Sequence, residues 1–239
     1  GLKAKIGSYD TRMGLSKTAE SLYHEDESEY FSILLPKRGK IRKIFPRGGR
    51  EMSKFAIVTD STSYIPTDVA QKHGITIAPQ VLIWDNQTYR DGIDIQPTDF
   101  YSRLKTAKSM PSTSQVSPAT MQEIFQGLVE KGTSVLGIFI SSKLSGTLQS
   151  AIQAKDMMGS AGEKVTLVDS RSTAMGLGFQ AIIAARAAEA GASIEEAAAQ
   201  ASSAHDRTGV FFAVDTLEFL HRGGRIRGAQ RFIGSALIL

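Results

Sequence analysis

The sequence contains no cysteine and only four histidines among its 239 residues. Without thiols there is no disulfide framework and no thiolate metal site, and we expect a reducing, cytoplasmic setting. The histidines at positions 24, 73, 205 and 221 do not lie at metal-ligand spacing from another ligand. No run approaches the roughly 18 apolar residues of a membrane helix, and the first residues lack the apolar centre of a secretory signal.

The chain also has little net charge, because 28 Lys and Arg face 24 Asp and Glu. The positive excess lies within residues 1–51, whereas residues 52–239 carry 17 charges of each sign. The larger part therefore gives no electrostatic reason to expect nucleic acid as a partner. The basic segment 36–50 leaves one alternative open, an arm that binds nucleic acid or a membrane surface.

Residues 1–51 differ in character from the rest of the chain. They hold an acidic patch and a basic patch without sustained helical or strand periodicity, which is typical of a disordered extension. Gly48, Gly49, Arg50 and Glu51 can all be written with purine-only codons, as in a bacterial ribosome-binding site, and Met52 follows them directly. Our hypothesis is that residues 1–51 are a translated leader, which abundant peptides from this segment in natively expressed protein would contradict.

From Met52 onward, short apolar runs alternate with helical patterns. Three short apolar runs predict buried strands: FAIVTDS (55–61), VLGIFI (135–140) and VTLVDS (165–170). The segment 75–84 predicts extended chain before an Asp85-Asn86 turn, and helices are expected near 66–72, 99–105, 118–131, 145–158, 178–190 and from the capping box at 193–196. This alternation predicts an α/β fold with a parallel sheet covered by helices on both faces.

Small hydroxyl side chains gather where these strands end. They follow the strands at 60–63, 141–147 and 169–173, and a further group lies in PSTSQVSP (111–118). In parallel sheets the ligand binds at the carboxyl ends of strands, and a helix start offers unpaired N–H groups to an anion. The hydroxyls therefore predict an oxyanion cradle rather than a nucleophile, although Ser, Thr and Asp are also ordinary helix caps.

Motifs of several enzyme classes are missing. There is no G-x-S-x-G nucleophile elbow and no G-x-x-x-x-G-K-[ST] phosphate loop. An independent phosphotransferase, or another anion-binding α/β enzyme, stays open as the alternative function, but it needs an ATP phosphate site that the sequence lacks. The arginines at 222, 225, 227 and 231 surround two glycines and fit either a solvated helix end or a cationic lip for phosphate or an acidic partner.

Five separated segments in this order resemble the DegV family, the fatty-acid-binding subunits of bacterial fatty acid kinase. They are VTDSTSYIP, PSTSQVSP, SSKLSGTLQSA, VDSRSTAMGLG and LHRGGRIRGAQ, and the likeness runs from about Lys54 to Leu239. The resemblance implies a DegV-like two-domain α/β fold with a long-chain fatty acid in a tunnel between the domains. Together with the composition of residues 1–51, it divides the chain into a disordered or translated leader (1–51), an N-terminal α/β domain (52–205) and the start of a truncated second domain (206–239).

The resemblance also implies a site. The fatty acid carboxylate is expected to bind the hydroxyls of Thr113 and Ser145, with four neighbours completing the polar end of the tunnel: Ser112, Ser114, Ser142 and Gly146. A partner kinase would use ATP to phosphorylate the bound acid, so the chain alone is not expected to be an enzyme and needs no cofactor. Arg225 is expected at the domain interface or in kinase docking.

One departure from the family concerns length. The family's chain continues well past the point where this sequence stops, so the second α/β domain is present only in part. The missing part carries a His and an Arg near the carboxylate in the family, and we expect ligand binding by the shorter chain to be affected. Transient membrane contact is also expected, because a free long-chain acid prefers lipid to water.

Overall fold

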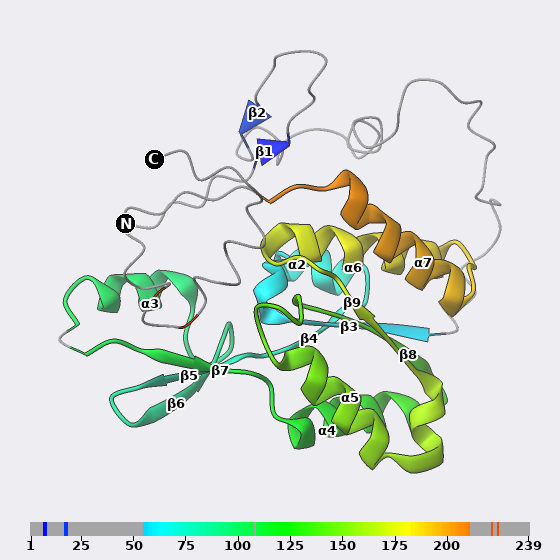
Figure 1. Cartoon of the computed structure of the whole chain (residues 1–239), viewed down its shortest axis with the longest axis horizontal. Helices are drawn as coiled ribbons and strands as arrows, with labels where there is room; N and C mark the ends of the chain where they lie inside the picture. The colour runs from blue at the N-terminus through cyan, green and yellow to red at the C-terminus, as the bar shows by residue number, and fades with distance from the viewer. Residues whose placement is uncertain are drawn as a thin grey trace.

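The computed structural model describes residues 7–8, 17–18, 55–107, 109–210, 221 and 224. Its centre is a parallel sheet with the strand order β4-β3-β8-β9 (Figure 1). The strands are β3 (Phe55–Asp60), β4 (Thr76–Ala78), β8 (Ser134–Phe139) and β9 (Val165–Asp169). The three strands predicted as buried are therefore confirmed, and all pairs in this sheet run parallel.

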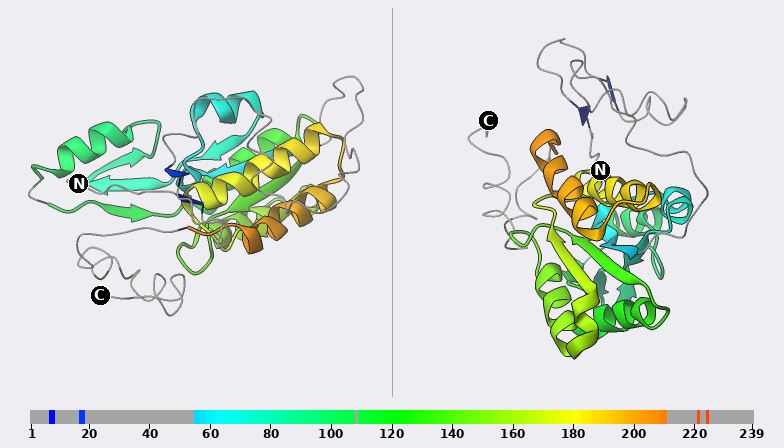
Figure 2. Two further views of the ribbon diagram at one scale, coloured as in Figure 1. Left: turned by 90° about the horizontal axis from the view of Figure 1, so that it is seen from above. Right: turned by 90° about the vertical axis from the view of Figure 1, so that its right-hand side faces the viewer.

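Helices cover both faces of this sheet, as the apolar runs predicted (Figures 1 and 2). Alternate residues of β8 point to opposite faces, so Val135 and Phe139 join one apolar core while Leu136 and Ile138 join the other. The first core is closed by α4 (Pro118–Val129) and α5 (Thr147–Met157). The second is closed by α2 (Thr67–Lys72), α6 (Ala174–Glu189) and α7 (Ile194–Ala204).

Local signals in the sequence explain where several helices begin. Ser117 accepts a hydrogen bond from the Thr120 N–H ahead of Pro118, the first residue of α4. Ser193 and Glu196 form the predicted capping box at the start of α7. Short 3₁₀ turns at Ser61–Ser63, Gly159–Lys164 and His205–Arg207 join the main elements.

A second, antiparallel sheet was not predicted. It has the order β6-β5-β7 and extends to one side of the parallel sheet, with α3 (Pro97–Leu104) beside it (Figures 1 and 2). Its strands are β5 (Val81–Trp84), β6 (Gln87–Arg90) and β7 (Ser112–Ser114). Asp85 and Asn86 form the predicted turn between β5 and β6, both with positive φ as a two-residue hairpin requires.

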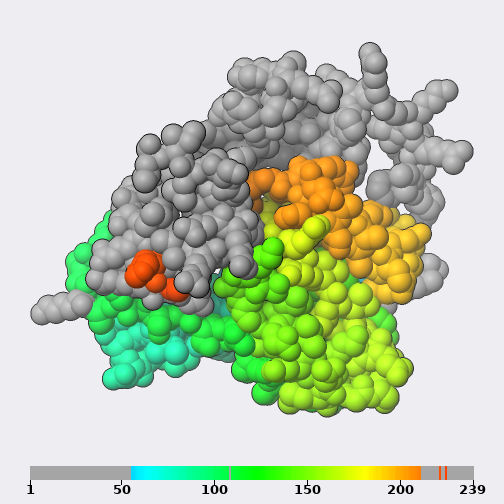
Figure 3. All heavy atoms as spheres, viewed as in Figure 1, coloured from blue at the N-terminus to red at the C-terminus, as the bar shows by residue number. Residues whose placement is uncertain are grey.

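In the space-filling view the antiparallel sheet and the residues of α5 occupy adjoining parts of one face (Figure 3). A separate pair of two-residue strands, β1 (Gly7–Ser8) and β2 (Lys17–Thr18), is antiparallel. Within the described ranges no helix is long and apolar enough to cross a membrane. The predicted leader, the domain boundaries and most of the expected second domain fall largely outside the described residues and stay predictions.

Candidate functional site: hydroxyls at the carboxyl edge of the parallel sheet

The parallel sheet has a topological switch point between β3 and β8. From β3 the chain passes through α2 to β4 on one side, and from β8 it passes through α5 to β9 on the other side. These two helices lie on opposite faces of the sheet, so the loops that follow β3 and β8 diverge. In open α/β sheets this divergence creates the crevice in which ligands bind.

Asp60 ties the two strand ends together at this point. Its side chain is fully buried, and its Oδ2 accepts a hydrogen bond of 2.9 Å from the backbone N–H of Ile140. Oδ1 accepts from the backbone N–H of Thr62 at 3.0 Å and from the Thr62 hydroxyl. Because a buried carboxylate needs such donors, we interpret Asp60 as the structural anchor of the crevice rather than as a ligand-binding group.

The loop after β8 is held to the loop after β9 by a second carboxylate. The Ser142 hydroxyl donates to Asp169 Oδ2 at 2.6 Å, and the Arg171 N–H donates to Asp169 Oδ1 at 2.8 Å. Ser141 is buried, and its N–H donates to the carbonyl of Ser172. The proton of the Ser142 hydroxyl is thus already in use, so a contact of Ser142 with an anionic ligand stays a prediction.

Ser145 lies two residues before Thr147, the first residue of α5, and its side chain is half-buried. Its Oγ is 2.9 Å from the hydroxyl of Thr147 and 3.2 Å from the Thr147 backbone N–H. Thr147 is fully buried and also contacts the side-chain amide of Gln80 at 2.8 Å. The helix predicted from position 145 therefore begins two residues later. Ser145 lies just before the N-terminus of α5, which is the positive end of the helix dipole.

Gly146 has an ordinary backbone conformation, with φ −80° and ψ 4°. Its lack of a side chain instead makes room for Gln115, since a Cβ at position 146 would lie 2.0 Å from Gln115 Oε1. The Gln115 amide also donates to the hydroxyl of Ser150 at 3.0 Å. The group that approaches Gly146 in this structure is thus a protein side chain, whereas the sequence predicted a ligand there.

The hydroxyl segment Ser112–Ser114 forms β7, an exposed strand of the antiparallel sheet. Thr113 pairs with Leu82 of β5, so it shares a face of the sheet with this buried residue. Ser112 and Ser114 lie on the other face, because successive side chains of a strand alternate. A single ligand group can therefore meet either the Thr113 hydroxyl or the two serine hydroxyls, but not all three.

Gln115 follows β7 directly and reaches Gly146 and Ser150 at the start of α5. The structure thus brings the T-S-Q and L-S-G segments together, although they lie about 30 residues apart in the sequence. Sequence reasoning missed Gln115 and Gln80 as members of this site. The sequence did offer a signal for Gln80, which is the only amide side chain in the mostly apolar run ITIAPQVLIW.

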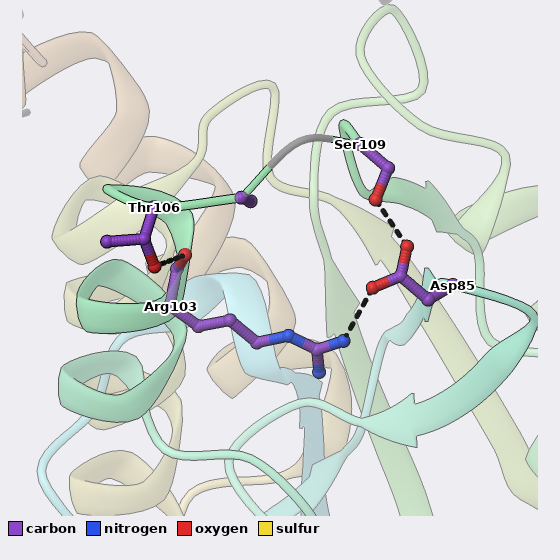
Figure 4. A pocket seen from close by; sticks show the side chains of 5 residues that line it. Asp85, Arg103, Thr106 and Ser109 are labelled. Atoms are coloured by element: carbon purple, nitrogen blue, oxygen red, sulfur yellow. Dashed lines mark hydrogen bonds and ion pairs between the residues drawn. The ribbon is translucent and has the colours of Figure 1, made fainter.

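A pocket of about 590 Å³ lies beside the antiparallel sheet and is lined by none of the predicted site residues (Figure 4). Arg103 donates to Asp85 at 2.9 Å and stacks over the Trp84 ring at 4.2 Å. The hydrogen bond from Ser109, with the nearby Arg103 guanidinium, lowers the pKa of Asp85. Arg103 and Ser109 both donate hydrogen bonds to Asp85 and so hold the segment that precedes β7. We therefore interpret the pocket as structural.

Arg225 lies outside the described residues, and its predicted role stays untested. In the part of the chain that the structure describes, no group of three or more His, Cys, Asp or Glu side chains is arranged to hold a metal ion. The site therefore consists of hydroxyls, side-chain amides and backbone N–H groups, which can hold an anion by hydrogen bonds.

The sequence matches a known protein family. Residues 54–239 match the family model described as an uncharacterised protein of the DegV family. A DegV domain-containing protein of Caldanaerobacter subterraneus is 39% identical over 186 residues, which are 78% of this chain and 65% of that protein. The chain thus spans about 65% of the length of the curated relatives that it matches.

Two solved structures share the fold. A DegV family protein from Thermus thermophilus, described by its fatty acid binding, is 36% identical with a TM-score of 0.66, over 77% of this chain and 65% of that one. A stearic acid-binding protein from Eubacterium ventriosum is 28% identical with a TM-score of 0.65, over 76% of this chain and 64% of that one. The family match, which extends from residue 54 to the last residue, and the identity to the curated relative establish that the chain belongs to the DegV family.

Proposed function

We propose that the protein binds a long-chain fatty acid and holds its carboxylate at the hydroxyls in front of α5. The observation that carries this proposal is the position of the Ser145 hydroxyl, half-buried at the start of α5 and beside the switch point of the sheet. Two structural relatives bind fatty acids according to their descriptions, which supports the choice of ligand.

The chemistry of the site fits a carboxylate that is bound and not attacked. Hydroxyl and N–H groups form charge-assisted hydrogen bonds with an anion, each contributing about 1.5–3 kcal/mol. A tail contributes about 0.8 kcal/mol for each buried CH₂, so a C16 acid would be held mainly by its chain. The hydroxyls then fix the orientation of the head group, for which no general base is needed.

Within the proposal, Thr113 and Ser145 provide the principal contacts. Gly146 supplies backbone at the same point, next to Gln115. Ser112 and Ser114 lie on the face of β7 opposite to Thr113, and Ser142 donates to Asp169, so we assign these three serines to the surroundings of the head group.

We further propose that the chain presents its bound acid to a separate kinase, which supplies ATP and forms the acyl phosphate. The absence of a phosphate-loop motif from the sequence supports a division of labour between two proteins. Such a partnership belongs in the cytoplasm, where ATP is available. Arg225 is our candidate for the contact with the kinase.

The test is a titration of the delipidated chain with palmitate. Ser145→Ala and Thr113→Val should each weaken binding about 10-fold or more, the loss of one charge-assisted hydrogen bond. Ser203→Ala on the exposed side of α7 and Thr88→Val on β6 are matched controls that should bind like the unaltered chain. Unchanged affinity in both site variants would overturn the assignment of the carboxylate site.

A further inference from the structure

The hydrogen-bonding capacity of Ser145 is limited by Thr147. A serine hydroxyl has one proton to donate and two lone pairs that can accept. The Thr147 backbone N–H donates to Ser145 Oγ at 3.2 Å, and the Thr147 hydroxyl lies 2.9 Å from the same atom. If the Thr147 hydroxyl donates, both lone pairs of Ser145 are used and only its proton is left for a ligand.

The contacts of Gln80 bear on the direction of the bond between Thr147 and Ser145. Its side-chain nitrogen lies 2.8 Å from the Thr147 hydroxyl oxygen, whereas its side-chain oxygen lies 3.3 Å from it. The shorter contact makes the amide N–H a donor to Thr147, because an amide nitrogen cannot accept. The hydroxyl proton of Thr147 then has two acceptors within reach, Gln80 Oε1 at 3.3 Å and Ser145 Oγ at 2.9 Å. The shorter contact favours Ser145, so we infer a chain of bonds from Gln80 through Thr147 to Ser145.

The backbone of Gln80 is held in place by two hydrogen bonds. The backbone N–H of Gln80 donates to the Ser61 hydroxyl at 3.1 Å, and the Gln80 carbonyl accepts from the Asp91 N–H at 2.9 Å. Gln80 therefore sits where the chain leaves the parallel sheet for the antiparallel one. Gln80 and Thr147 are both at least nine-tenths buried, so water does not compete for their bond.

We infer that Gln80 and Thr147 are positioning residues that restrict Ser145 to the role of hydrogen-bond donor and so make the site selective for an ionised head group. A carboxylate only accepts hydrogen bonds and matches a hydroxyl that only donates. An alcohol of the same chain length gains less from a hydroxyl that only donates, because the alcohol carries no charge. Its own proton also finds no acceptor at Ser145, since both lone pairs of Ser145 are used. This inference rests on the proposed function and adds to it the means of selecting the head group.

The test compares two probes, palmitate and 1-hexadecanol, on the delipidated chain. Thr147→Val removes the hydroxyl but keeps the shape, and it should lower the ratio of the two affinities about fivefold to 10-fold by weakening palmitate binding. Thr147→Ser should restore the ratio. Gln80→Met, which keeps the length of the side chain but removes the amide, should lower the ratio in the same way and gives a second route if Thr147→Val does not fold.

Thr59→Val is the matched control. Thr59 is as fully buried as Thr147, and its hydroxyl has no hydrogen-bond partner within the described residues, so the ratio should not change. A double variant with Ser145→Ala separates positioning from a general structural effect. If Thr147 acts through Ser145, then adding Thr147→Val to Ser145→Ala should weaken palmitate binding no further.

The possible outcomes distinguish the proposed function from the positioning role of Gln80 and Thr147. If the unaltered chain binds neither probe, the proposed function fails, and the inference fails with it. If it binds palmitate but Thr147→Val leaves the ratio unchanged, or the two substitutions weaken palmitate binding additively, the positioning role is wrong and the proposed function stands.

Discussion

The side-chain amide of Gln115 lies directly over Gly146, so that a Cβ at position 146 would come within 2.0 Å of Gln115 Oε1. The same amide donates to the Ser150 hydroxyl in the first turn of α5. This relationship connects the end of β7, which carries Thr113, to the loop that carries Ser145. It brings the two hydroxyl segments together, as the proposed site requires.

Gly146→Ala should therefore alter the site without unfolding the chain. The new methyl group must displace the flexible Gln115 side chain. The loss of the hydrogen bond from Gln115 to Ser150 should lower the free energy of unfolding by about 0.5–1.5 kcal/mol. Palmitate affinity should also fall, because the contact between the two segments is lost. Chemical denaturation and ligand titration measure these effects. Gln115→Ala should reproduce the stability loss, and a double variant that is additively worse would contradict this explanation.

Gly178→Ala and Gly127→Ala are predicted to have opposite effects on stability. A Cβ at Gly178 of α6 would lie 2.7 Å from the backbone carbonyl of Ser63, which cannot move aside as a flexible side chain can. We expect a loss of about 1–3 kcal/mol, typical of overpacking. At Gly127 of α4 a Cβ meets nothing within 4 Å, so alanine should stabilise the helix by about 0.5–1 kcal/mol.

Urea denaturation of the two glycine variants measures this difference. The same substitution in two helix interiors separates the local contact from the general preference of helices for alanine. If both substitutions changed the free energy of unfolding equally and in the same direction, the close packing of α6 against the residues after β3 would be contradicted.

The carboxyl group of Asp94 should titrate well below the usual range. The Arg90 side chain donates to both of its oxygens, at 2.8 and 2.9 Å, and the Arg90 backbone N–H donates at 2.7 Å. These hydrogen bonds lower the pKa of Asp94 from 3.8 to about 2. Because the folded pKa is depressed, the interaction stabilises the folded chain above about pH 4 and is lost as the pH falls towards 2.

A pH titration of the Asp94 carboxyl carbon by nuclear magnetic resonance measures this pKa directly. Arg90→Gln should move the midpoint up towards 3.8. The stability difference between this variant and the unaltered chain should be present at pH 7 and should disappear as the pH falls through about 2. A midpoint near 4 in the unaltered chain would show that the Arg90–Asp94 pair is absent in solution.

The parallel sheet could be predicted from the sequence because its strands are short apolar runs with polar ends. The antiparallel sheet could not. Residues 75–84 were predicted as one extended segment, although Pro79 and the polar Gln80 interrupt its apolar pattern where the chain passes between the two sheets. β7 consists of three hydroxyl residues, which lack the apolar alternation that indicates a strand.

The site was predictable in part for a related reason. Ser145 and Thr113 belong to segments that resemble the family, and the ends of β3, β8 and β9 were expected to meet at one edge of the sheet. The contact between Gln80 and Thr147, beside Ser145, could not be predicted, because the two residues lie 67 positions apart in the sequence. Such a contact depends on the tertiary structure, and no local pattern records it. The resemblance likewise groups Thr113 with Ser112 and Ser114, whereas the strand places them on opposite faces.

Fatty acid binding by the chain is the central claim, and native mass spectrometry of the purified protein, followed by extraction and lipid analysis, tests it most directly. We expect a bound long-chain fatty acid at close to one molecule per chain, either as purified or after addition of palmitate. We also expect Ser145→Ala to lose this ligand at lower collision energy. A chain that carries no fatty acid and takes up none from added palmitate would contradict the account.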